Sequence, residues 1–177
     1  EAMDYGFALI TEERKANGLF LKGNLTFNTT IANLGSYKKG PALSDSKMTK
    51  ATSDEIKIMH TKCMGPEDMI SALSGGNQQK VVFAKALLTE PSIWLCDEPT
   101  QAVDVATRQE IHRLLKEEAK KGKAVLYVSS DLTELLEVAD EVAVMAYGRV
   151  RKTFENKDLK PTDVLACCYE AEREESD

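Results

Sequence analysis

Two adjacent carboxylates, Asp97 and Glu98, directly follow the apolar run at residues 93–96. Such a run is typical of a buried strand, and α/β sheets bind their ligands at the carboxyl ends of the strands. In nucleotide hydrolases of this build, the first acid orients Mg²⁺ on the β and γ phosphates and the second polarises the attacking water. A strand that simply ends in two surface acids is the alternative, and this hexapeptide alone does not exclude it.

A second candidate is the octapeptide LSGGNQQK at residues 73–80, which precedes an expected helix. Its two glycines let the backbone approach an anion closely, its serine can donate to that anion, and the helix N-terminus adds positive potential. A Gly-Gly loop with a serine cap is the plainer interpretation. The acid pair lies one helix and one turn later and is followed by PTQAVD, so the combination is more specific than either part.

The elements that must position these residues alternate between strands and helices. Continuous apolar runs indicate strands buried on both faces, as in a parallel sheet with helices on each side. The sequence therefore predicts the α/β class. The expected strands are residues 7–10, 93–96, 125–128, 142–145 and 150–154, the last after a hairpin turn at 147–149; the expected helices are residues 26–34, 50–63, 105–121, one ending near residue 88 and one starting at Asp131.

Composition narrows the classes of function. The 177 residues carry 23 Lys plus Arg against 29 Asp plus Glu, a formal net charge of −6, so no nucleic-acid partner is expected. No apolar run approaches the ~18 residues of a membrane-spanning helix, and we expect no secretion leader. The four scattered cysteines predict neither a zinc site nor a disulfide framework. His60 and His112 are expected at the surface and are given no role.

Taken together, these segments resemble the ATP-binding-cassette ATPases. LSGGNQQK matches the signature motif of that family, IWLCDE its Walker B motif and residues 101–104 its D-loop. The resemblance implies a P-loop NTPase-like parallel-sheet core with a small helical subdomain. It also implies ATP and Mg²⁺ as cofactors, held where two cassettes meet head to tail, each nucleotide lying between the Walker motifs of one cassette and the signature of the other.

The resemblance gives each matching residue a role. Glu98 would be catalytic, and Asp97 would hold the metal. The signature residues would contact a nucleotide bound mainly by the partner cassette; they are Ser74, Gly75, Gly76 and Gln78. Three further positions are Asp104 of the D-loop, Glu12 at the Q-loop equivalent and Ser130 at the switch position.

Three stretches narrow the resemblance: GNQQK in the signature, TEERK after the first strand and VSSDLTELL at the switch. They are similar to the second cassettes of double-cassette monosaccharide importers, above all those for galactose and methyl galactoside. The implied partners are membrane permease subunits, the other cassette of the same protein and, indirectly, an extracytoplasmic sugar-binding protein. The implied location is the cytoplasm, peripheral on the inner face of the cell membrane. A soluble cassette ATPase without transport function and a non-catalytic regulatory cassette remain alternatives.

Departures from the family pattern are as informative as the matches. Gly18 and Gly23 have the spacing of the phosphate cradle GxxxxGK[ST], but Asn24 and Leu25 follow where a lysine and a hydroxyl are needed. We therefore expect the Walker A strand upstream of residue 1, and no ATPase activity from this piece alone. Ser130 replaces the usual switch histidine, and Glu12 replaces the usual glutamine, as in second cassettes of sugar importers.

The expected organisation has four parts. Residues 1–23 form the first core strand with the Q-loop equivalent, 24–76 the helical signature subdomain, 77–158 the core with Walker B, D-loop and switch, and 159–177 a C-terminal helix with an acidic tail. In the strand order that the resemblance implies, strands 7–10, 93–96 and 125–128 are neighbours. Because the Walker A strand is missing, we expect strand 142–145 to close up against strand 125–128, or a second chain to fill the gap.

Overall fold

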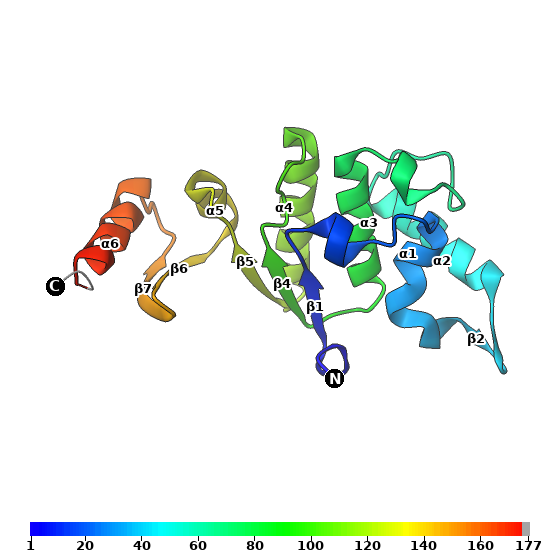
Figure 1. Ribbon diagram of the computed structural model, residues 1–177. Helices are drawn as coiled ribbons and strands as arrows, with labels where there is room; N and C mark the ends of the chain where they lie inside the picture. Colours follow the sequence, from blue (N-terminus) through cyan, green and yellow to red (C-terminus); the bar gives the residue numbers. More distant parts are fainter. Residues whose placement is uncertain (175–177) are drawn as a thin grey trace. The chain divides into compact units, whose positions relative to one another are not determined.

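The computed structural model describes residues 1–174, so the last three residues of the expected acidic tail lie outside it. The chain divides into two compact units, Glu1–Tyr127 and Val128–Asp177, each of which is described by itself (Figure 1). No helix within the described part of the chain is long and apolar enough to cross a membrane.

The first unit is built on a three-stranded sheet in the order β1-β4-β5. β1 (Phe7–Ile10) runs parallel to β4 (Ile93–Asp97), with Phe7 opposite Ile93 and Ile10 opposite Cys96. β5 (Ala124–Val128) is the third strand. The predicted neighbours and the α/β class are therefore confirmed.

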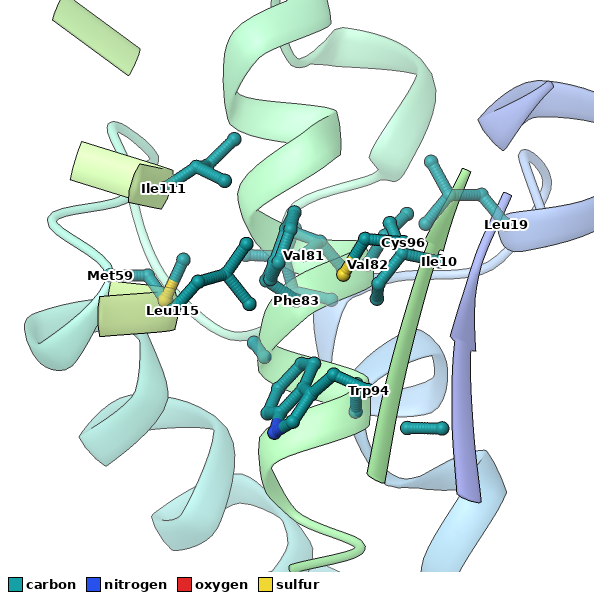
Figure 2. Close-up of a cluster of buried hydrophobic side chains, with 14 of the residues drawn as sticks. Ile10, Leu19, Met59, Val81, Val82, Phe83, Trp94, Cys96, Ile111 and Leu115 are labelled. Atoms are coloured by element: carbon teal, nitrogen blue, oxygen red, sulfur yellow. The ribbon is translucent and has the colours of Figure 1, made fainter. Parts of the chain in front are cut away.

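Helix α3 (Gly75–Leu87) is the centre of this unit, because nine of its thirteen residues are buried. Figure 2 shows its side chains between those of the sheet and those of α4 (Val105–Lys120). The Phe83 ring stacks on the Trp94 indole with 6.1 Å between centroids. A helix surrounded in this way is fixed from several sides, so its N-terminus, where LSGG lies, is held in a defined place.

The other face of the sheet differs from the expectation. Ile10 and Trp94 are fully buried against α3, whereas Leu9 and Leu126 point the opposite way and are both 59% exposed. The prediction that the strands are buried on both faces is therefore wrong for the described chain. The apolar runs were read correctly as strands, but burial of their second face depends on elements that residues 1–174 do not supply.

A small region of helices and turns lies between β1 and α3. Its elements are a π-helical turn Arg14–Gly18, α1 (Leu25–Thr30), a 3₁₀ segment Ile31–Tyr37, the short pair β2 (Lys38–Lys39) and β3 (Ala42–Leu43), α2 (Asp45–Ile58) and a 3₁₀ turn Ile70–Ala72. A further 3₁₀ turn, Met3–Tyr5, precedes β1. Helix α2 begins earlier than expected and ends earlier, because Met59 caps it and His60 takes a positive φ of 47°.

The second unit contains α5 (Leu132–Val138), the hairpin β6 (Glu141–Ala146) and β7 (Arg149–Glu155), and α6 (Pro161–Glu174). The Asp131 side chain caps α5 as predicted, and Tyr147 and Gly148, both at positive φ, form the predicted turn. In the described residues β6 hydrogen-bonds to β7, and β5 pairs only with β4. The β6–β7 hairpin leaves the outer edge of β6 free, and the expectation that β6 closes up against β5, which would join the two units, stays a prediction. The alternative of a second chain stays a prediction.

Candidate functional site

The acid pair lies where the sequence places it, at the carboxyl end of β4. Asp97 is the last residue of the strand and is exposed, and Glu98 is half-buried. Glu98 has a φ of 45°, and Ala102, four residues later, a φ of 53°. Two residues with side chains in the left-handed region within one loop are unfavourable and persist only where surrounding contacts hold them. The conformation of the loop between β4 and α4 is therefore held in place by contacts with its surroundings.

The signature segment begins helix α3. Ser74 is the N-cap, and its Oγ accepts hydrogen bonds from the Asn77 side chain at 2.9 Å and from the Asn77 backbone N–H at 3.4 Å. Asn77 in turn accepts from the Lys62 backbone N–H at 2.8 Å. Ser74 is exposed, and its hydroxyl proton is directed by neither of these bonds. A donor therefore lies at the exposed N-terminus of a well-buried helix, as anion binding requires.

The two signature glycines are required by packing inside this chain. A Cβ on Gly76 would lie 2.8 Å from Thr107 Oγ1 and 3.0 Å from Asp104 Oδ2, at the start of α4. A Cβ on Gly75 would lie 2.8 Å from a terminal nitrogen of Arg14. The sequence explains the glycines by an approaching anion, and the structure adds that they let the signature lie directly against the D-loop.

The glutamines after the glycines are buried. Gln78, predicted to contact nucleotide, is 5% exposed and donates from its amide to the carbonyl oxygens of Ile70 and Leu73. Gln79 is 1% exposed and donates to the Pro99 carbonyl at 2.6 Å. The first glutamine therefore shapes the signature loop, and the second ties α3 to the loop that follows the acids.

The first loop also reaches the D-loop. Glu12 accepts a hydrogen bond from the Gln101 side chain at 2.8 Å, and Arg14 donates to the Gln101 carbonyl at 3.0 Å. The Arg14 Nε atom is buried and has no hydrogen-bond partner within the described chain. Arg14 thus touches both the D-loop and Gly75, and it links three segments that are far apart in the sequence.

Asp104 fixes the start of α4. Its carboxylate accepts from the Thr107 backbone N–H at 3.0 Å and from the Thr107 hydroxyl at 2.8 Å. These hydrogen bonds lower the pKa of Asp104 below its ordinary value. The D-loop aspartate is therefore a helix cap held as an anion.

One histidine was misjudged from the sequence. His112 is buried, and its Nε2 lies 3.2 Å from the Tyr127 hydroxyl, which lies 3.3 Å from the Thr100 hydroxyl. Helical periodicity would have given a signal, since His112 follows Ile111 and precedes Leu115 on the inward side of α4. These contacts connect α4 and β5 to Thr100, and so stabilise the loop that follows the acid pair. His60 is exposed as expected.

The side chains around the acid pair determine how many protein ligands a metal ion could have there. Within residues 1–174, no group of three or more His, Cys, Asp and Glu side chains is placed to hold a metal ion. Mg²⁺ commonly uses one or two carboxylates, with water and substrate phosphates as its other ligands. An exposed Asp97 at a strand end fits that mode of binding and does not fit a metal held by protein alone.

The structure brings most of the predicted site residues onto the first unit. Glu12, the signature and the D-loop are joined by the contacts above. Ser130 belongs to the second unit, between β5 and α5, and its place relative to the others is not defined. Arg14, Gln79 and Thr107 are the contributors that sequence reasoning missed.

The parallel sheet, with the glycine-containing start of α3 and the acid pair at the end of β4, is a P-loop NTPase-like α/β fold. The family model described as "ABC transporter" matches residues 10–101, and the chain belongs to this family. It is 25% identical to a dimeric ATP-binding cassette, MJ0796, in a post-hydrolysis state with ADP and Pi. The TM-score is 0.71, and the match covers 88% of this chain and 66% of that one.

Among curated proteins the chain is similar to galactose/methyl galactoside import ATP-binding proteins named MglA. It is 45% identical over 92% of its length to that of Treponema pallidum, and 46% identical over 93% to that of Treponema denticola. The protein of Escherichia coli K12 is 41% identical over 93% of the chain. The chain spans only about a third, 32% and 33%, of the two Treponema proteins.

Proposed function

We propose that this chain is part of the second cassette of the ATP-binding subunit of a sugar importer, for galactose, methyl galactoside or a related monosaccharide. The observation that carries the proposal is 45% identity, over 92% of the chain, to a protein with that name. The packing of the signature glycines against the D-loop supports it, because it holds the two motifs as one surface that a second cassette can meet.

In this proposal the Walker B acids and the signature residues have different roles. Asp97 holds Mg²⁺, and Glu98 orients and activates the attacking water. Ser74 and the N–H groups of Gly75 and Gly76 bind the terminal phosphate of a nucleotide held mainly by the other cassette. ATP with Mg²⁺ supplies the leaving group and the charge neutralisation.

Three of the remaining predicted residues, Gln78, Glu12 and Asp104, position this surface. Gln78 shapes the signature loop from within, so its contribution to nucleotide binding is indirect. Glu12 and Asp104 fix the two ends of the D-loop through Gln101 and Thr107. Ser130 follows the third strand of the sheet at the switch position.

The piece described here lacks a lysine and backbone nest for the β and γ phosphates. We therefore propose that it hydrolyses no ATP alone, and that turnover belongs to the longer protein. The partners in that protein are permease subunits, its own other cassette and, indirectly, an extracytoplasmic sugar-binding protein. The complex acts on the cytoplasmic, inner face of the cell membrane.

The test uses the full-length protein assembled with its permease in vesicles, with ATP-driven galactose uptake as the readout. Ser74→Asp keeps a good N-cap for α3 but puts a negative charge where a phosphate must bind, so uptake is expected to be lost. Ser71→Asp, on an exposed residue three positions earlier, is the matched control and retains uptake. Equal uptake by both variants contradicts the trans-nucleotide role of the signature.

A second candidate, a non-catalytic regulatory cassette, is favoured by Ser130 in place of the switch histidine. In this case ATP still binds and closes the two cassettes, but Glu98→Gln leaves the ATPase rate of the full-length protein unchanged. A rate that falls with this substitution rejects the regulatory alternative.

A further inference from the structure

The loop between β4 and α4 is held through one buried threonine side chain. Thr100 is 3% exposed and lies two residues after Glu98. Its hydroxyl oxygen lies 3.3 Å from the hydroxyl oxygen of Tyr127 on β5, which in turn lies 3.2 Å from Nε2 of His112 on α4. The middle of the loop is therefore linked to the helix and the strand that follow it in the chain.

The two ring side chains in this link have little freedom to move. The imidazole of His112 and the phenol ring of Tyr127 meet edge to face, with 5.9 Å between their centroids and 74° between their planes. His112 is buried, and Tyr127 packs against the hydrophobic core of the first unit. A tyrosine hydroxyl can donate one hydrogen bond and accept another, so it can serve two neighbours at once. The packing of the rings thus fixes the place of the hydroxyl that Thr100 meets.

The position of Thr100 matters for Glu98 because both belong to one closed turn. The Gln101 backbone N–H donates to the Glu98 carbonyl oxygen at 3.1 Å, so residues 98–101 move together. The φ of 45° at Glu98 is unfavourable for a residue with a side chain and persists only where contacts hold it. A contact that holds Thr100 therefore helps to fix the direction of the Glu98 side chain.

Two other side chains hold the same loop, but both also belong to the signature surface. Gln79, which follows the signature glycines in α3, donates to the backbone of the loop, and Arg14 lies against Gly75. A change at either residue would alter the signature and the loop together. Tyr127 and His112 lie outside the signature, so removal of their contacts tests the loop separately.

We propose that His112 and Tyr127 are positioning residues for ATP hydrolysis: they hold Thr100, and through it the turn that directs the Glu98 carboxylate at the attacking water. This inference rests on the proposed function, in which Glu98 activates that water. In this role neither residue touches the nucleotide. Removal of their contacts therefore slows hydrolysis and leaves the affinity for ATP unchanged.

The test measures kcat and KM for ATP in the full-length protein. The rate at the site that Glu98 serves is the part of the total ATPase rate that Glu98→Gln removes. Tyr127→Phe keeps the ring and removes the hydroxyl; kcat at this site is expected to fall by about fivefold to tenfold, and KM to change by less than about twofold. Tyr37→Phe is the matched control, because it removes the hydroxyl of another buried tyrosine of the first unit, and it should change neither constant.

A pair of substitutions at His112 separates positioning from packing. His112→Phe keeps a ring but has no nitrogen, so kcat should fall as it does in Tyr127→Phe. His112→Gln places an amide, which can donate or accept, near the Tyr127 hydroxyl, and should bring kcat to within about twofold of the unmodified protein. A role in packing alone predicts the opposite order, since phenylalanine retains more of the ring contacts than glutamine does.

A double substitution shows whether Glu98 is the group that is positioned. In the Glu98→Gln background, Tyr127→Phe should cause no further loss, because no carboxylate is left to direct. A further loss there, an unchanged kcat in Tyr127→Phe, or an equal loss in Tyr37→Phe would overturn the inference and leave the role of Glu98 intact. If Glu98→Gln itself removed no activity, the proposed catalytic role of Glu98 would fail, and this inference with it.

Discussion

The two ends of strand β4 present opposite kinds of polar chemistry. At the carboxyl end, the functional groups are exposed and are held by partners in the chain: Glu12 by Gln101, Ser74 by Asn77, and Asp104 by Thr107. At the amino end, Glu55 lines one hollow with Glu90, which precedes β4; Glu55 is buried and one of its oxygens has no partner. An exposed and braced set of groups is suited to a large partner that completes it from outside. A buried carboxyl with an unpaired oxygen instead affects stability through its own protonation.

The largest expected effect concerns catalysis at the carboxyl end of β4. In the full-length protein, Glu98→Gln should lower hydrolysis at the one composite site that Glu98 serves by about 10²- to 10⁴-fold, because it removes the group that activates water there. Phosphate release under saturating ATP and Mg²⁺ measures this. Glu13→Gln, an exposed residue of the first loop, is the control and should leave the rate unchanged. Loss of activity in both variants would place the effect in the loops and not in catalysis.

The second prediction concerns how tightly the start of α3 packs against the start of α4 at the carboxyl end of β4. Gly76→Ala puts a Cβ 2.8 Å from Thr107 Oγ1, so α3 and the cap of α4 must separate. We expect a loss of roughly 2 to 3 kcal/mol in the free energy of unfolding. Urea unfolding measures it, with Gly65→Ala as the control, because a Cβ on Gly65 meets nothing within 4 Å. An equal loss in the two variants would show that the signature does not need a glycine for packing.

The third prediction concerns the amino end and its pH dependence. The pKa of Glu55 is raised to about 7 by burial and by the repulsion of Asp54 and Glu118. The folded state therefore holds a proton that the unfolded state releases, so stability falls as pH rises from about 4.5 to 7. Glu55→Gln has no such loss and should be more stable than the unmodified protein by roughly 1 to 2 kcal/mol at pH 8, and equal to it near pH 4.

Thermal and urea unfolding at a series of pH values measure this difference. Asp45→Asn serves as the control, because it removes a charge from an exposed residue at the other end of α2 that is not among the groups acting on Glu55. A Glu55→Gln variant whose advantage does not grow between pH 5 and pH 8 would show that the carboxyl ionises freely, and that the two ends of β4 are not so different.

Much of the fold could be predicted because its signals are local. Apolar runs gave β1, β4 and β5, and the turn at Tyr147 and Gly148 gave the hairpin. The covering of the second sheet face could not be predicted, since it depends on which other elements are present. An exposed Leu9 beside a buried Ile10 shows that an apolar residue in a strand does not by itself reveal what covers it.

The candidate site could likewise be predicted from the sequence only in part. The acid pair and the signature were located by residue type and spacing, and the loops between β4 and α4 and before α3 present them as expected. Arg14, Gln79 and Thr107 could not be assigned because their partners are distant in sequence or their roles depend on the close packing of two loops. Gln78 has the residue type of a ligand, but its burial turns it inward.

The smallest expected effect tests whether the first loop helps to brace the D-loop. Arg14→Gln removes the hydrogen bond to the Gln101 carbonyl and the contact with Gly75, which together should lower the free energy of unfolding by about 1 kcal/mol. The loss should be local, with faster amide hydrogen exchange at the D-loop and unchanged exchange in the core of α3. Lys15→Gln removes the same charge from the adjacent exposed residue and should alter neither measurement. If both variants loosened the D-loop equally, net charge would explain the effect, and the carboxyl end of β4 would owe its order to the signature and Thr107 alone.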